Sequence, residues 1–147
     1  MSSERVSSSA QTVFRAALTG GVIAAVINAV WLLVGNAVID GSVRTASPGS
    51  SDYSNLAAWR VAIATLVASV AAGVLYLGLT RFAPARARTI FLAVVAVATL
   101  ASFGAPHGLD IPGSQKFILT VMHVVTGVVV AGALTFRRGT SSAFGRI

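Results

Sequence analysis

Residues 117–136 have the sequence FILTVMHVVTGVVVAGALTF, which contains no formally charged side chain and a single ionisable one, His123. As an α-helix, these twenty residues extend about 30 Å, the thickness of the hydrocarbon core of a bilayer. Lys116 precedes the stretch and Arg137 follows it, at positions where cations reach the lipid headgroups. The stretch therefore predicts a transmembrane helix.

The composition of the whole chain is that of a membrane protein. Of its 147 residues, 55% are hydrophobic and 10% are charged, whereas charged residues make up about a quarter of an ordinary soluble domain. The net charge of +7 raises the question of a nucleic-acid partner. Most arginines lie just beyond the ends of apolar stretches, so the charge indicates membrane orientation and anionic lipid, and no nucleic-acid partner is expected. The chain has no cysteine, which excludes disulfides and thiolate metal sites.

Three more apolar stretches are long enough to cross a bilayer. With the stretch described above, the predicted spans are residues 16–38, 57–79, 89–105 and 117–136. The membrane domain is expected to occupy residues 13–138, between a flexible serine-rich tail at residues 1–12 and a basic C-terminal tail at residues 139–147. The long polar connection between the first two spans has turn chemistry at Pro48-Gly49 and is predicted to be an extramembrane loop.

The distribution of cations predicts which ends of the helices face the cytoplasm. Eight arginines lie in or beside the two tails and the second connection. Three cations lie in or beside the other two loops, together with Asp40, Asp52 and Asp110. Under the positive-inside rule, both termini are cytoplasmic and the number of spans is even. The expected fold class is all-α, an integral membrane antiparallel four-helix bundle, located in a bacterial cytoplasmic membrane.

One group of polar residues inside the predicted spans forms a candidate site: Asn28, His123 and Thr126. By their positions in the spans, Asn28 and His123 differ in depth by about 4 Å, so their side chains can meet and form a hydrogen bond. Two interpretations remain open. The pair is a structural contact between helices, or His123 serves as a proton carrier, a pore-facing polar group or a hydrogen-bond partner of a quinone. Thr126 is expected to bond its own backbone rather than to act as a nucleophile.

A second group of polar residues lies at the predicted outer mouth of the bundle: Arg60, His107 and Asp110. Arg60 is either a snorkelling cation or a ligand contact. Haem held by two histidines is disfavoured because His107 lies in or beside a loop, several turns away from His123. The two histidines and three aspartates have no spacing typical of a zinc site. The sequence thus predicts no catalytic, cofactor-binding or metal-binding residue, and no enzyme.

Two short motifs carry a resemblance to a known family: Asn28-Ala-Val-Trp31 in the first span and Met122-His123-Val-Val-Thr-Gly127 in the fourth. With these motifs, the chain resembles the small four-span membrane proteins grouped as the DUF6069 family. The resemblance covers nearly the whole chain, apart from the loop at residues 40–55. It implies a four-helix integral membrane protein of unknown function, and it supplies no catalytic residues.

Two functions from different classes are compatible with these features. The spans are rich in packing residues and poor in charge, which favours an accessory, scaffold or assembly subunit that lies in the lipid bilayer and packs against itself or a larger membrane complex. The alternative is a small transporter or channel component that uses His123 as an intramembrane polar or proton-carrying group. A continuous water-accessible cavity reaching His123 would favour transport, whereas a space filled by Leu, Val and Ala side chains would favour the scaffold.

Overall fold

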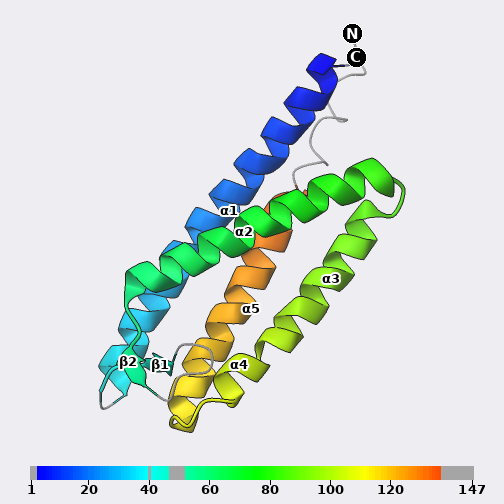
Figure 1. Ribbon diagram of the computed structural model, residues 1–147. Coiled ribbons are helices and arrows are strands. Elements are labelled where there is room, and N and C mark those ends of the chain that lie inside the picture. Colours follow the sequence, from blue (N-terminus) through cyan, green and yellow to red (C-terminus); the bar gives the residue numbers. More distant parts are fainter. Residues whose placement is uncertain (1–2, 40, 47–51, 137–147) are drawn as a thin grey trace, which may run out of the picture.

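The computed structural model describes residues 3–39, 41–46 and 52–136 (Figure 1). Its elements are α1 (Ser3–Val38), β1 (Arg44–Ala46), β2 (Tyr53–Asn55), α2 (Ala58–Phe82), α3 (Ala87–Ser102), α4 (Gly104–His107) and α5 (Gly113–Thr135). Within these residues, four helical stretches are long and apolar enough to cross a membrane: Ala10–Val38, Ala58–Phe82, Ala87–His107 and Gly113–Thr135. They pack against one another, which confirms the predicted helical membrane fold.

The N-terminal segment differs from its prediction. Residues 1–12 were expected to form a flexible tail, but α1 is continuous from Ser3 to Val38. Residues 3–12 contain no glycine or proline, so nothing in them stops a helix that is already nucleated by the apolar stretch that follows. The predicted basic tail at residues 139–147 lies outside the described residues.

The helices extend beyond the predicted spans at several ends. The third, expected at residues 89–105, begins at Ala87 and reaches His107 through α4, which follows α3 after a break at Phe103. Pro106 is compatible with α4 because it lies in the first turn, where its missing N–H has no helical partner to lose. The helix of the second span continues to Phe82 at its C-terminal end. The helix of the fourth span already begins at Gly113. Apolarity marks the hydrocarbon thickness, whereas helical hydrogen bonds continue into the polar interface.

A small β-hairpin interrupts the expected all-α architecture. Strands β1 and β2 pair antiparallel within the first connection, which was predicted as an extramembrane loop. Two side chains attach this connection to the bundle. Asn36 Oδ1 in α1 accepts the Val43 N–H at 2.8 Å, and Gln115 Oε1 in α5 accepts the Arg44 N–H at 3.0 Å. The hairpin is therefore fastened across the ends of α1 and α5.

Helix α1 packs through small residues and presents large ones outward. The buried residues of one face of α1 include Gly21, Ala24, Asn28 and Gly35, and Trp31 is half-buried. Exposed positions on the same helix carry large aliphatic side chains, including Val22, Ile23, Val26, Ile27, Val30 and Leu33. In a bilayer such side chains lose nothing by facing lipid, while small residues let helix backbones approach closely. This distribution explains why α1 lies against both α2 and α5.

Helix α3 is the peripheral helix of the bundle. In the most apolar 18-residue segment of Ala87–His107, the stretch that contains α3, 11% of residues are buried. The corresponding share is 33% in α1, 28% in α2 and 33% in α5. Only Ala87 and Phe91 of α3 are buried, both near its N-terminal end. Phe91 packs on Tyr76 of α2 with ring centroids 4.9 Å apart. From their connection, α2 and α3 diverge toward the end of the bundle that carries α4 (Figure 1).

The connections alternate between the two ends of the bundle. The start of α1, the α2–α3 connection and the end of α5 lie toward one end, and the hairpin, α4 and the start of α5 lie at the other (Figure 1). The end with the α2–α3 connection is called the basic end, because Arg81, Arg86 and Arg88 lie in and beside that connection. The second is the hairpin end.

Candidate functional site

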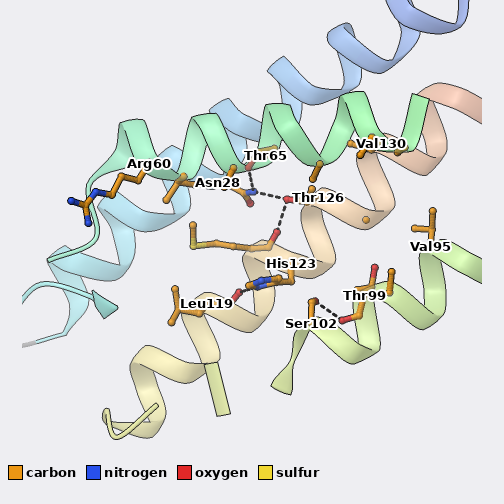
Figure 2. Close-up of a pocket in the computed structure, with 18 of the residues that line it drawn as sticks. Asn28, Arg60, Thr65, Val95, Thr99, Ser102, Leu119, His123, Thr126 and Val130 are labelled. Atoms are coloured by element: carbon orange, nitrogen blue, oxygen red, sulfur yellow. Dashed lines mark hydrogen bonds between the residues drawn. The ribbon is translucent and has the colours of Figure 1, made fainter. Parts of the chain in front are cut away.

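A cavity of about 790 Å³ lies where α2 and α3 diverge, with residues of α1 and α5 also in its lining (Figure 2). This volume is within the range of about 300–1,000 Å³ typical of small-molecule sites. Most of the lining is apolar, and alanine is the commonest residue on the α2 side. The cavity therefore resembles a site for a largely apolar molecule.

The polar groups of the lining are concentrated toward the hairpin end. Arg60, Ser102 and His123 lie there, whereas Leu75 and Val130 line the cavity farther toward the basic end. The lining of α2 extends from Arg60 to Leu75, which is about 22 Å along a helix axis. A molecule in this cavity would meet polar groups at one end and hydrocarbon along the rest of its length.

Asn28 is the buried polar centre of the site. It is 1% exposed, and its Nδ2 donates to Thr126 Oγ1 at 2.8 Å and, over a longer distance of 3.4 Å, to Thr65 Oγ1 (Figure 2). The Thr126 hydroxyl donates its own proton to the Met122 carbonyl at 2.9 Å, so it can only accept from Asn28. This assigns nitrogen to the amide atom that faces Thr126. The other amide atom, Oδ1, is buried without a hydrogen-bond partner.

His123 does not pair with Asn28, which corrects the predicted contact. The half-buried ring lines the same cavity, but its Nδ1 lies 2.7 Å from the carbonyl oxygen of Leu119, one turn earlier in α5 (Figure 2). The ring bonds a backbone carbonyl of its own helix and therefore needs no partner from α1. The estimated depths were adequate, but the partner of Asn28 is Thr126, which lies almost one turn farther along α5.

This contact also assigns the tautomer of His123. A carbonyl oxygen only accepts hydrogen bonds, so Nδ1 carries a hydrogen, and Nε2 is an acceptor when the ring is neutral. No hydrogen bond involves Nε2 within residues 3–39, 41–46 and 52–136. Together with Asn28 Oδ1, it gives the site two acceptors that the described protein leaves unused.

The three predicted outer-mouth residues are not grouped around the cavity. Arg60 lines its hairpin end, with the guanidinium 5.4 Å from the centre of the Trp59 ring. His107 and Asp110 do not belong to the lining. The His107 ring bonds the Phe103 carbonyl at 2.8 Å, and the Asp110 backbone N–H donates to the Tyr53 hydroxyl at 2.9 Å. His107 is the last residue of α4, and Asp110 lies in the connection between α4 and α5.

The sequence analysis missed the contribution of α3. Thr99 and Ser102 line the cavity, and the Ser102 hydroxyl donates to the Thr99 carbonyl at 2.6 Å. A Cβ placed on Gly127 of α5 would lie 2.5 Å from Thr99 Oγ1, so α3 and α5 are in close contact beside the cavity. The glycine was the available signal, but a single glycine in a Gly- and Ala-rich span does not identify the helix that it contacts. Thr65 of α2 also lines the cavity and accepts from Asn28 Nδ2.

Comparison with known proteins gives a family but no activity. No curated protein matches the chain, and no solved structure does. The model of DUF6069, described as a family of unknown function, matches residues 8–140, which is most of the chain. Both motifs quoted for the resemblance lie inside the matched region, as does every residue that lines the cavity. The chain therefore belongs to the DUF6069 family, as the resemblance of its first and fourth spans predicted.

Proposed function

We propose that this small membrane protein binds a lipid-like molecule in the cavity between α2, α3 and α5, and that it works as a non-catalytic carrier component. The observation that carries the proposal is a largely apolar cavity that reaches His123 and has an unpaired buried Asn28 carbonyl in its wall. Small-molecule sites combine apolar walls with a few placed polar groups in the same way. The cavity favours the transport alternative of the sequence analysis over a tightly filled scaffold.

A filling substitution tests the cavity directly. Ala98→Phe places a ring on the cavity face of α3, and Ala93→Phe places the same ring on an exposed position of α3 outside the lining. In phosphatidylcholine nanodiscs, we expect Ala98→Phe to weaken the binding of tritiated oleyl alcohol at least about tenfold, because bulk replaces the space that the chain occupies. The Ala93→Phe control should bind like the wild type. Equal binding by both variants, or no binding by the wild type, would contradict the proposal.

A second candidate function has its own supporting observation. Ala64, Ala68 and Ala71 are exposed on α2 at helical spacing and line the cavity, as small residues do where membrane helices pack closely. In this case the protein is an accessory, scaffold or assembly subunit, and a helix of another copy or of a larger complex occupies the cavity. A stoichiometric membrane partner that co-purifies with the wild type, and is lost in Ala98→Phe but not in Ala93→Phe, would favour this function.

We also propose that both termini are cytoplasmic, in the cytoplasmic membrane of a bacterium. The basic end contains Arg81, Arg86 and Arg88, and cations are retained on the cytoplasmic side. Because the chain has no cysteine, single substitutions give clean labels. A membrane-impermeant maleimide should label Asn55→Cys at the hairpin end in intact cells, and Ala85→Cys only after permeabilisation. The reverse pattern would overturn the orientation.

A further inference from the structure

We infer that the cavity selects a neutral amphiphile with a hydrogen-bond donor, such as a hydroxyl group, at the end of an apolar body. This inference rests on the proposed binding function and adds the chemistry of the ligand. In the bound state the donor hydrogen is accepted by Asn28 Oδ1 or by His123 Nε2, and the apolar body extends along the alanine-rich face of α2 toward Leu75.

Three polar side chains of the lining have already used their donors. Thr126, Ser102 and His123 each donate to a backbone carbonyl three or four residues earlier in their own helices. The Asn28 amide group donates to two threonines. Acceptor capacity remains, at Asn28 Oδ1 and at the second nitrogen of His123. A ligand complementary to these groups must therefore bring the hydrogen.

A buried acceptor without a hydrogen bond raises the free energy of the unliganded protein. A ligand that donates to this acceptor removes that cost and therefore binds more tightly. Asn28 lines the cavity but is only 1% exposed and its Oδ1 is buried, so the donor reaches Oδ1 only when a neighbouring side chain moves. Met122 lines the same cavity, and its unbranched thioether side chain adapts readily to a new neighbour. His123 is half-buried and is the more accessible of the two acceptors.

The charge of the lining favours a neutral ligand. No aspartate or glutamate lines the cavity, all of whose lining residues are among those described, so an ammonium group would be buried without a counter-ion. Arg60 is the single formally charged residue in the lining and lies at its hairpin end. A carboxylate placed deeper would face the acceptors of Asn28 and His123 and be repelled by them. A hydroxyl or amide group meets neither obstacle.

The test compares oleyl alcohol with its methyl ether, which keeps the chain and the oxygen but has no donor. Tritiated ligands are titrated into the protein in phosphatidylcholine nanodiscs, with empty nanodiscs subtracted. We expect the wild type to bind the alcohol at least about tenfold more tightly than the ether, and oleylamine, which is cationic at pH 7, more weakly than the alcohol. Equal affinity for alcohol and ether, or tighter binding of the amine, would overturn the inference and leave the proposed binding function intact.

Variants of both acceptors locate the selectivity. Asn28→Leu and His123→Leu should each reduce the preference for the alcohol while the affinity for the ether stays unchanged. His123→Gln retains an acceptor and should keep most of the preference. If Asn28→Leu fails to fold, the two half-buried His123 variants still decide the point. If both His123→Leu and Asn28→Leu keep the preference for the alcohol, the assignment of the two acceptors is wrong. If the wild type binds neither the alcohol nor the ether, the proposed binding function itself is wrong.

Discussion

Replacing Gly21 by leucine is expected to prevent the bundle from forming. A Cβ placed on Gly21 of α1 would overlap Ser69 Oγ of α2 and lie 2.8 Å from Ser69 Cβ. Ser69 is fully buried and its hydroxyl donates to the Leu66 carbonyl at 2.8 Å, so its side chain has no free space to enter. The two helix backbones would have to separate along their main contact. Overpacking by a few methylene groups costs about 1–3 kcal/mol, and a whole leucine side chain at this point is expected to exceed that range.

The matched control for this substitution is Gly78→Leu in α2. A Cβ at Gly78 meets no atom within 4 Å, and leucine is a better helix former than glycine. The measurement is the yield of monodisperse protein in detergent, together with the midpoint of thermal unfolding. Gly78→Leu should equal or exceed the wild type in both. A well-folded Gly21→Leu protein with an unchanged midpoint would show that α1 and α2 do not depend on this close approach.

Phe91→Ala is expected to release α3 from the bundle. Phe91 has 0% exposure and is the largest buried side chain of a helix that has few buried residues. Its removal would delete the contact with Tyr76 and leave a void in the cluster at the basic end. We expect a loss of roughly 2 kcal/mol, below the 3–5 kcal/mol of soluble cores, because in a bilayer packing is lost but little transfer from water is involved.

Leu92→Ala provides the control for Phe91→Ala on the same helix. Leu92 is 39% exposed, so its truncation should change stability much less. Hydrogen exchange of α3 amides in nanodiscs measures the effect locally, and thermal unfolding measures it globally. Exchange should rise across α3 in Phe91→Ala and stay low in α1 and α5. Equal effects of the two substitutions would mean that α3 is held by lipid contact rather than by Phe91.

The sequence identified several residues of the candidate site by their type. It did not predict which of them form hydrogen bonds with each other. Asn28, Thr126 and His123 stood out because polar side chains are rare in apolar spans, and all three line the cavity. The predicted hydrogen bond between Asn28 and His123 is wrong because a histidine in a membrane helix can bond its own backbone, as His123 does with the Leu119 carbonyl. Spacing along one helix does not indicate which of several acceptors a ring will use. The roles of Thr99 and Ser102 depended on the position of α3, which no local pattern predicts.

The sequence by itself determined the number of long apolar helices and their approximate positions. These properties depend on composition within one segment, because transfer into hydrocarbon and close helix approach are set by the residues of that segment. Only the tertiary structure decided that α3 diverges from α2, that a cavity of about 790 Å³ lies there, and that Asn28 Oδ1 remains unpaired in its wall. Helix tilt and rotation result from contacts among all the helices together, so residues distant in sequence had to be placed before the acceptors of the site could be recognised.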